Sequence, residues 1–326
     1  MTSGGGLRKI AWWSLSFLVS GVLLYYSLRG VDWAAVWRTV VRAQWQYLAA
    51  GSTITLAAFF LRSLRWRILL NAEGSFPVGT VFWANMAGYL GNNFLPARAG
   101  ELLRSVLISS RSTLSNAYVL TTALSERLMD VIALVLGASL VLLTVDPKPR
   151  WMEDLSRTMA IVATLGAVAI MVLPHTGTLL KTVLMRIPMP AGLRKTLVHL
   201  AEQILLGMRA FHDWARFAGF VLLTLFIWAS DSASAIVIAR GLGLHVSFGV
   251  ALLLLTGMGL GSALPSTPGY VGVYQFVAVT ILTPFGFSRD AALAYILVVQ
   301  VSGYVVVLLF GLPGLYRLQV RAPLPN

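Results

Sequence analysis

The chain is organised around the stretch Gly91-Asn-Asn-Phe-Leu-Pro-Ala-Arg-Ala-Gly-Glu101, where two amides, a proline, an arginine and a glutamate lie within a strongly apolar neighbourhood. A charged side chain near the centre of a bilayer costs roughly 2.5–3.5 kcal/mol, so it normally marks a water-filled pathway or a paired site. A second stretch, at residues 261–270, repeats the Leu-Pro-x-x-x-Gly core of the first. We interpret the two stretches as breaks in membrane helices.

The composition is typical of a polytopic membrane protein. Only 11% of the 326 residues are charged and 57% are hydrophobic, whereas about a quarter of the residues in a soluble domain are charged. The formal net charge is +13, but the basic residues fall in short segments between apolar runs, as the positive-inside rule requires. We therefore expect a multi-pass protein of the cell (plasma or inner) membrane, with no nucleic-acid partner.

Several classes of chemistry have no support in the sequence. The chain contains no cysteine, which excludes thiol catalysis, disulfides and thiolate metal sites. The four histidines are dispersed near the ends of apolar segments, so we expect no metal site. No nucleophile motif, metal cluster or phosphate-binding loop is recognisable. We accordingly expect no cofactor and no enzymatic activity.

Apolar runs long enough to cross a bilayer recur along the chain. About six full spans are expected, at residues 10–28, 45–61, 118–145, 159–173, 217–239 and 291–312. Arg62, Arg65 and Arg67 directly follow the second run, and we expect them to snorkel to a cytoplasmic interface. The polar triplet Ser230-Asp231-Ser232 interrupts the fifth run.

Two other segments have the pattern of helices that lie on a membrane surface. Valine and tryptophan recur at helical spacing over residues 31–42, with Asp32 placed to cap, which predicts an interfacial helix on the outer surface. The most polar segment, 175–216, is rich in lysine and arginine and carries apolar side chains every three or four positions. It predicts an amphipathic cytoplasmic helix attracted to anionic lipid.

Each break is flanked by apolar pieces that are too short to cross a membrane. Residues 81–95 and 102–109 flank the first break, and residues 248–264 and 270–282 flank the second. Irregular backbone at membrane depth is tolerated where it lines a cavity. We therefore expect two re-entrant hairpins built from broken helices, each returning to the side from which it entered.

The distribution of basic residues predicts the orientation. If both hairpins return to their own side, both termini and residues 175–216 face the cytoplasm, while residues 146–157 and 240–247 face out. The chain 1–326 then forms a single all-α membrane domain. Its halves, about 10–145 and 158–316, form an inverted repeat like those of secondary transporters, in which discontinuous helices meet near the membrane midplane.

This layout makes a prediction about the two hairpin tips. We expect the tips at Pro96 and Pro265 to approach each other from opposite faces of the membrane. Arg98 and Thr267 should then line one shared, wet cavity, because unsatisfied backbone groups need water or protein partners.

The first candidate site residues are Arg98, Glu101 and Arg104, which share roughly one face of the helix after the break. Two arginines face one acid, and the excess positive charge suits a phosphate, which arginine binds with two parallel hydrogen bonds. The alternative is a self-neutralising pair that only stabilises the hairpin.

A second group contains the acidic residues of two other spans. Glu126 and Asp130 lie one helical turn apart with Arg127 between them, so they could carry a proton or could pair with Arg98 or Arg104. Asp231 could equally be a lone proton carrier or a partner to an arginine of the first half of the chain. The remaining candidates for substrate binding are polar side chains within the two breaks, namely Asn92, Asn93, Ser266, Thr267 and Gln275.

Three motifs occur in order along the chain: Asn92-Asn-Phe-Leu-Pro-Ala-Arg-Ala-Gly-Glu-Leu-Leu-Arg104, Glu126-Arg-Leu-Met-Asp130 and Leu264-Pro-Ser-Thr-Pro-Gly-Tyr-Val-Gly-Val-Tyr-Gln275. Together they resemble the lysylphosphatidylglycerol synthetase transmembrane-region family, a flippase-like membrane module. The resemblance implies that, in the two-part members of the family, this module moves the aminoacylated lipid that a separate soluble domain makes. We expect no such domain and no aminoacyl transfer here. Gln275 stands where family members commonly carry a glutamate, and an amide does not titrate.

The favoured function is translocation of an anionic or modified phospholipid between leaflets, with Arg98 and Arg104 holding the head-group phosphate. The expected partners are a membrane lipid as substrate and a separate lipid-modifying enzyme. An accessory role in polyprenyl-phosphate or lipid-linked glycan assembly is the alternative, and an intramembrane enzyme is the third reading.

Overall fold

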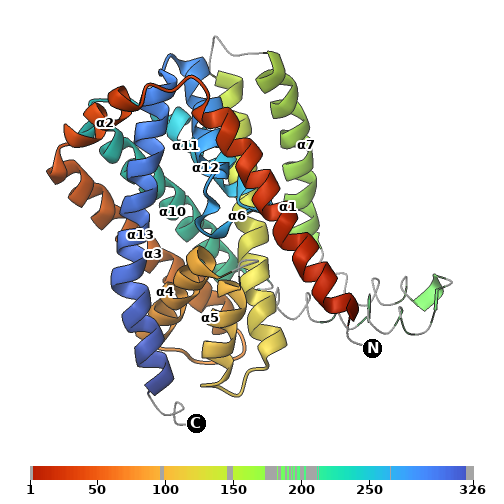
Figure 1. Ribbon diagram of the computed structural model, residues 1–326. Helices are drawn as coiled ribbons and strands as arrows, with labels where there is room; N and C mark the ends of the chain where they lie inside the picture. Colours follow the sequence, from red (N-terminus) through yellow and green to blue (C-terminus); the bar gives the residue numbers. More distant parts are fainter. Residues whose placement is uncertain are drawn as a thin grey trace.

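The computed structural model describes residues 3–95, 99–144, 150–172, 213–264 and 266–320, with a few further residues between 182 and 211. All elements in these ranges are helices, so the expected all-α fold is confirmed (Figure 1). In chain order they are α1 (Ser3–Leu28), α2 (Trp33–Val41), α3 (Trp45–Leu70), α4 (Val78–Phe94), α5 (Gly100–Ser109), α6 (Asn116–Thr144), α7 (Arg150–Val172), α10 (Trp214–Gly241), α11 (Phe248–Gly261), the 3₁₀ turn η4 (Pro268–Tyr270), α12 (Val273–Leu282), the 3₁₀ turn η5 (Thr283–Phe285) and α13 (Arg289–Val320).

Membrane-spanning helices are identified by their length and apolar character. Within the described ranges, three helices pass both criteria: Trp45–Leu70, Trp214–Gly241 and Arg289–Leu318. The pair Ser14–Leu28 and Trp33–Val41 passes together and is bent by 87°. Asp32 caps the second member of this pair, because its side chain accepts hydrogen bonds from the amides of Ala34 and Ala35. The predicted cap of the short helix α2 is therefore confirmed.

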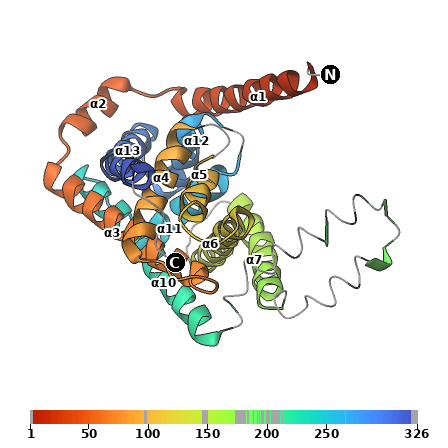
Figure 2. The same cartoon turned by 90° about the horizontal axis from the view of Figure 1, so that it is seen from below.

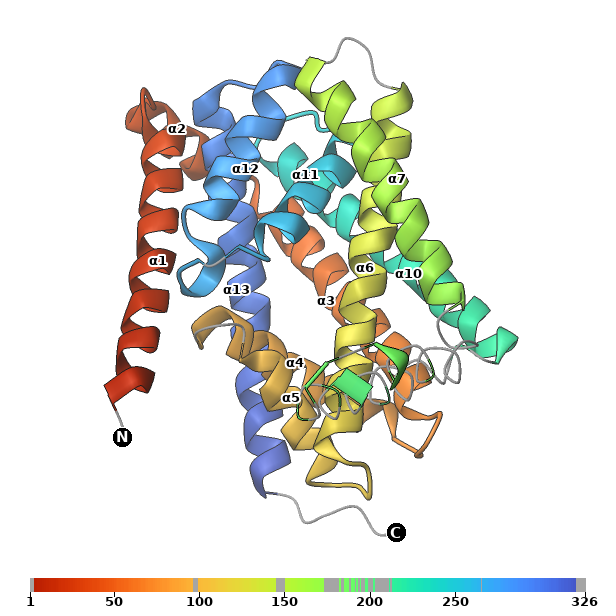
Figure 3. The ribbon, with the colours of Figure 1, turned by 90° about the vertical axis from the view of Figure 1, so that its right-hand side faces the viewer.

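The two broken elements occupy opposite halves of the molecule. In Figure 3, α4 and α5 pack side by side in the lower half, while α11 and α12 form a second hairpin in the upper half. The end of α4 contacts η4, the turn between α11 and α12. The two hairpins therefore meet near the middle of the bundle. Pro96, Arg98 and Pro265 lie outside the described residues.

Glycines set the close approach of α4 and α5. A Cβ atom built on Gly100 would lie 1.9 Å from the Gly88 carbonyl oxygen, and a Cβ atom on Gly91 would lie 2.8 Å from the Gly100 Cα atom. Small residues allow helix backbones to approach in this way. The glycine that follows the first break thus fixes the spacing between the two halves of its hairpin.

Left-handed backbone conformations turn the second hairpin. The φ angles of Gly269, Tyr270 and Gly272 are 75°, 61° and 88°, and Tyr270 is the one non-glycine residue with a positive φ in the described chain. A Cβ atom on Gly272 would lie 2.3 Å from the Ser20 carbonyl oxygen of α1. The amide of Thr267 also donates to Ser20 Oγ at 2.9 Å. Helix α1, at the edge of the bundle (Figure 2), therefore packs directly on this break.

The buried apolar side chains form two main clusters, one on each side of the meeting point of the hairpins. One cluster surrounds Trp66 and includes residues of α3, α4, α5 and α6. The other surrounds Tyr295 and includes residues of α2, α10, α11, α12 and α13.

Three sequence predictions about element boundaries were wrong. Helix α3 continues to Leu70, so Arg62 and Arg65 lie within it; they are buried in ion pairs and do not snorkel to an interface. The triplet Ser230-Asp231-Ser232 does not interrupt α10, which is continuous from Trp214 to Gly241, and Asp231 is paired with Arg62. Helix α13 does not stop near residue 312, since it continues through Pro313 to Val320.

The long helices share a common end. In Figure 3, α1 begins, α7 ends, α10 begins and α13 ends toward the lower end of the molecule. Most of the predicted amphipathic segment 175–216, including Lys195, lies outside the described residues. Of the predicted outer loop 146–157, residues 146–149 also lie outside the described residues, and residues 150–157 belong to α7.

Candidate functional site

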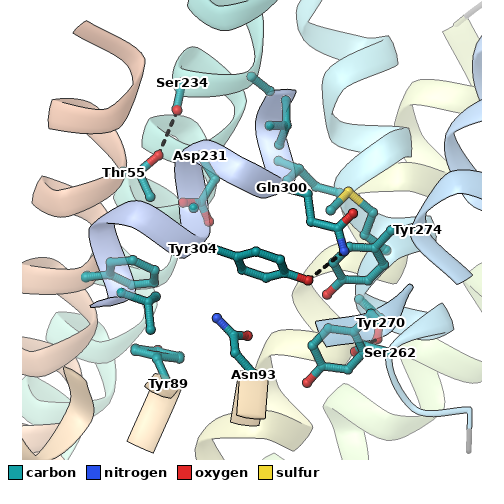
Figure 4. A pocket seen from close by; sticks show the side chains of 18 of the residues that line it. Thr55, Tyr89, Asn93, Asp231, Ser234, Ser262, Tyr270, Tyr274, Gln300 and Tyr304 are labelled. Carbon is teal, nitrogen blue, oxygen red and sulfur yellow. Dashed lines mark hydrogen bonds between the residues drawn. The ribbon is translucent and has the colours of Figure 1, made fainter. Parts of the chain in front are cut away.

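A cavity of about 310 Å³ lies where the two hairpins meet. Both hairpins and the helices α3, α6, α10 and α13 contribute to its wall (Figure 4). Small-molecule sites usually have volumes of roughly 300–1,000 Å³, so this cavity is of the size of a small ligand. Its polar and aromatic lining residues are Thr55, Phe59, Arg62, Tyr89, Asn92, Asn93, Arg127, Trp228, Asp231, Ser234, Ser262, Tyr270, Tyr274, Gln300 and Tyr304.

Helix α13 supplies two polar side chains that satisfy the backbone of the second break. Gln300 Nε2 donates to the Gly269 carbonyl oxygen at 2.6 Å and to the Tyr304 hydroxyl at 2.8 Å. The Tyr304 hydroxyl also donates to the Gly269 carbonyl. Gln300 and Tyr304 lie four residues apart on one face of a helix, and both reach the same turn. The carbonyl exposed by the left-handed turn is therefore fully bound within the protein.

The first break presents Asn93 to the same space. Its side chain points toward the Tyr304 ring across the cavity, and Tyr270 and Tyr274 form the adjoining wall (Figure 4). The rings of Tyr270 and Tyr274 stack with a centroid distance of 4.9 Å and an interplanar angle of 14°. Aromatic pairs in stacked geometry contribute about 0.5–1.5 kcal/mol beyond the burial of their area. This pair forms a flat surface at the second hairpin.

One ion pair lies in the wall opposite the tyrosines. Arg62 of α3 binds both carboxylate oxygens of Asp231 of α10, with one donor–acceptor distance of 3.2 Å. The guanidinium also lies 5.7 Å from the centroid of the Phe59 ring and 5.5 Å from that of Trp228. Arg62 is thus held by a carboxylate and by two aromatic faces.

A buried charge network lies next to the cavity, behind the first hairpin. Arg65 is 0% exposed and contacts Glu126 at 2.9 Å and Asp130 at 2.5 Å. It also donates to Thr224 at 3.1 Å. The planar guanidinium satisfies several acceptors at once, which is the geometry that arginine offers in buried sites. Arg65 therefore joins α3 to α6 and α10.

The network extends into the first hairpin through Glu101 and Arg104. Arg104 contacts Glu101 at 2.6 Å and Glu126 at 3.1 Å, and donates to Asn85 at 2.5 Å. Arg127 contacts the other oxygen of Glu101 at 2.8 Å, and its side chain is 36% exposed. Arg104 is buried among its partners, whereas Arg127 reaches the cavity.

The ion pairs of the cavity wall and of the adjacent network balance in charge. Four arginines (Arg62, Arg65, Arg104 and Arg127) are paired with four carboxylates (Glu101, Glu126, Asp130 and Asp231), giving a formal sum of zero. The excess of positive charge expected around Glu101 is not found among the described groups, because Glu126 supplies a second carboxylate to Arg104. Arg98 lies outside the described residues.

The predicted site residues that the structure describes lie in three places: the cavity, the charge network and the second break. Asn92, Asn93, Arg127 and Asp231 line the cavity. The other described candidates lie elsewhere: Glu101, Arg104, Glu126 and Asp130 belong to the charge network, and Ser266, Thr267 and Gln275 belong to the second break. Thr267 binds α1 and the Val271 carbonyl oxygen. Gln275 accepts a hydrogen bond from the Gly272 amide and donates to Gln300.

Sequence reasoning missed much of the cavity wall. The residues not predicted include Thr55, Tyr89, Ser234, Tyr270, Tyr274, Gln300 and Tyr304. The sequence did contain a signal for Gln300 and Tyr304, because these two polar residues lie one helical turn apart in an apolar run without charged residues. Arg62 and Arg65 were wrongly placed at an interface, because the apolar run before them is already long enough to be interpreted as a complete membrane span.

Two further observations concern metal ligands and a second pocket. In the part of the chain that the structure describes, no group of three or more histidine or acidic residues could hold a metal ion. A second pocket of about 670 Å³ lies between α2, α3 and α13. Apart from the backbone, its polar groups are the Trp33 and Trp37 indoles and the Ser302 hydroxyl, so it is poorly suited to a polar ligand.

Comparison with known proteins identifies relatives of the chain. It is similar to a protein of Haloferax volcanii named glycosyltransferase AglD, with 23% identity over 270 residues, covering 72% of this chain and 42% of that protein. The chain therefore spans less than half the length of this relative. Residues 13–311 match the family model described as lysylphosphatidylglycerol synthase TM region. Because that match covers most of its length, the chain belongs to the lysylphosphatidylglycerol synthase transmembrane-region family.

Proposed function

We propose that this protein carries a membrane lipid between leaflets, with the lipid head group in the cavity between the two hairpins. The observation that carries the proposal is the position of this cavity. Polar side chains of both hairpins reach into a lining that is otherwise largely apolar and aromatic, and the cavity is formed where two broken helices meet from opposite halves of a membrane protein whose described elements are all helices. Discontinuous helices that meet in this way form the substrate sites of many secondary transporters.

The proposal includes a topology. About six crossings with two re-entrant hairpins, related as an inverted repeat, would place both termini and residues 175–216 in the cytoplasm. The shared lower end of α1, α7, α10 and α13 supports this orientation. Labelling of a Lys195→Cys variant of the cysteine-free chain tests it: the thiol should react only after the membrane is permeabilised, and reaction in intact cells would contradict the orientation.

The substrate in this proposal is a phospholipid, and the protein acts as a carrier and not as an enzyme. A head-group phosphate would meet Arg62 and Arg127, whose side chains line the cavity. Arg104 is not suited to this role, because it is buried against two carboxylates and an amide. An enzyme that modifies the lipid is the proposed partner.

A leaflet-exchange assay with purified protein in vesicles tests this function. Labelled phosphatidylglycerol, lysylphosphatidylglycerol, phosphatidylcholine and a polyprenyl phosphate should be compared with protein-free vesicles. We expect acceleration of at least one lipid with a phosphate head group. Rates equal to those of protein-free vesicles for every lipid would contradict the proposal.

A role beside an enzyme of lipid-linked glycan assembly is the second candidate. The observation that favours it is the similarity to the protein named glycosyltransferase AglD. In this case the protein would bind a polyprenyl phosphate without moving it. Binding of polyprenyl phosphate with no leaflet exchange would support this candidate over the first.

A further inference from the structure

The two walls of the cavity differ in charge. The wall made by α3, α6 and α10 contains Arg62, Asp231 and Arg127, all of which are in ion pairs. The facing wall, made by the two breaks and α13, contains amides, hydroxyls and aromatic rings, and its described residues carry no charge. A ligand that spans the cavity would therefore meet charged groups at one end only.

Tyr270 is held in an unfavourable backbone conformation at the neutral wall. Its φ of 61° is uncommon for a residue with a bulky side chain, and glycine would adopt the conformation without cost. Strained residues of this kind cost of order 1–3 kcal/mol and are concentrated at binding sites. In this conformation the Tyr270 ring lines the cavity and stacks on the Tyr274 ring.

Hydrogen bonds fix the rest of this wall. Gln275 Nε2 donates to Gln300 Oε1 at 2.8 Å, and Gln300 in turn donates to Tyr304 and to the Gly269 carbonyl. The positions of Tyr304 and of the turn that carries Tyr270 are thus set before any ligand binds. The Asn93 amide faces them across the cavity (Figure 4).

The combination of a flat aromatic surface with amides and hydroxyls matches the chemistry of a sugar ring. One face of a pyranose carries C–H groups that pack on aromatic rings, and its edge carries hydroxyls that both donate and accept hydrogen bonds. A cationic ammonium head would fit less well. Elsewhere in the lining, guanidinium groups already lie over the rings of Phe59, Trp228 and Tyr89. Among the described residues, the one carboxylate that lines the cavity is Asp231, and it is bound by Arg62.

We propose that the wall formed by Tyr270, Tyr274, Tyr304, Gln300 and Asn93 binds a neutral, hydroxyl-bearing ring in the lipid head group, such as a single glycosyl unit. The inference rests on the proposed function, because it names the head group that the same cavity takes. A volume of about 310 Å³, near the lower end of the range for ligand sites, is suited to one ring and not to an oligosaccharide.

Lipid retention by the protein in nanodiscs tests this inference. Native mass spectrometry should compare monoglucosyl-diacylglycerol, diacylglycerol, phosphatidylglycerol and lysylphosphatidylglycerol as competing lipids. We expect the glucosyl lipid to be retained over diacylglycerol. The Tyr274→Leu variant should lose roughly three- to tenfold of this preference, the equivalent of one aromatic stacking contact.

Three further variants distinguish a loss of ring stacking from a loss of folding. Tyr274→Phe keeps the ring and should retain most of the preference. Tyr270→Gly removes the ring and relieves the backbone strain, so it should fold at least as well as the parent protein and lose the preference. Tyr25→Leu removes an exposed tyrosine of α1 that pairs with Tyr26 outside the cavity, and it should behave like the parent protein.

Several outcomes would overturn the inference. They are equal retention of the glucosyl lipid and diacylglycerol, preferential retention of lysylphosphatidylglycerol, and an unchanged preference in both Tyr274→Leu and Tyr270→Gly. Glucosyl-lipid binding without leaflet exchange of any lipid would contradict the proposed function but leave this inference intact. Leaflet exchange that does not respond to the tyrosine variants would contradict this inference but leave the proposed function intact.

Discussion

The two broken hairpins meet at one cavity, but different chemistry stabilises them. In α4–α5 the contacts are ionic: Glu101 and Arg104 bind each other and connect to Glu126 and Arg127 of α6. In the second hairpin the described contacts at the break are neutral, since amide side chains and hydroxyls bind the backbone of Gly269, Gly272 and Thr267. Both arrangements satisfy polar groups that have no water partner in hydrocarbon.

Because of this difference, we expect the first hairpin to be the more rigid and the second to be the more adaptable. Removing one partner of a buried ion pair leaves an uncompensated charge and costs about 3–5 kcal/mol, whereas one hydrogen bond between membrane helices contributes about 0.6–1.7 kcal/mol. The first hairpin should therefore tolerate few changes. The second can adjust at lower cost, which suits a wall that contacts a variable head group.

The largest effect is expected at Arg65. An Arg65→Leu substitution leaves Glu126 and Asp130 buried with one guanidinium fewer, so the free energy of unfolding should fall by about 3–5 kcal/mol. Unfolding in mixed micelles measures this change. Arg38→Leu, which removes an exposed arginine paired with Asp32, is the control and should change stability by less than about 1 kcal/mol.

The ion pair between Arg62 and Asp231 gives the next largest effect. Asp231→Leu alone should cost about 3 kcal/mol because Arg62 remains buried beside it. The double variant Arg62→Met/Asp231→Leu should recover most of this loss, since both charges are removed together. A double variant as unstable as Asp231→Leu would show that the pair has a role beyond mutual compensation.

Glycine packing in the first hairpin should have a smaller effect. A Cβ atom at Gly100 meets the Gly88 carbonyl, so Gly100→Ala should force α4 and α5 apart at a cost of about 1–3 kcal/mol. Gly79 lies in the same hairpin, and a Cβ atom added there would have no heavy atom within 4 Å, so Gly79→Ala should be neutral or stabilising by up to about 1 kcal/mol. Equal effects of the two changes would argue against the close approach.

The smallest effect is expected in the neutral hairpin. Gln300→Leu removes the hydrogen bonds donated to Gly269 and Tyr304 and the one accepted from Gln275. Each contributes about 0.6 kcal/mol on average, and Tyr304 still donates to Gly269, so the total loss should be about 1–2 kcal/mol. Gln46→Leu, at an exposed position of α3, is the matched control. A loss at Gln300 as large as that at Arg65 would remove the distinction between the ionic network beside the first hairpin and the neutral contacts of the second.

The sequence was sufficient to predict the breaks, but it did not reveal the pairing of the charges. Proline and glycine disturb a helix locally, so Leu-Pro-x-x-x-Gly could be located without knowledge of the fold. The cap at Asp32 was equally local. Arg65, in contrast, finds its partners on α6, more than sixty residues away, and only tertiary packing brings them together. The same reason explains why Arg62 and Arg65 were wrongly assigned to an interface.

Part of the candidate site could also be predicted from the sequence. Polar residues inside the breaks and spans indicated Asn92, Asn93, Arg127 and Asp231, which line the cavity. The aromatic wall was not predicted, because tyrosines in apolar segments are also common as ordinary packing residues. Its recognition required the left-handed conformation of Tyr270 and the stacking on Tyr274.

Passage of a lipid head group between the hairpins is tested most directly by joining them. In the cysteine-free chain, Asn93→Cys and Tyr270→Cys place one thiol on each hairpin at the cavity, where a short, cleavable thiol crosslinker can connect them. Each single variant treated with the same reagent is the control. We expect leaflet exchange in reconstituted vesicles to fall to the protein-free rate on crosslinking and to recover on cleavage. Exchange by the crosslinked protein at the rate of the uncrosslinked double variant would contradict passage through this cavity.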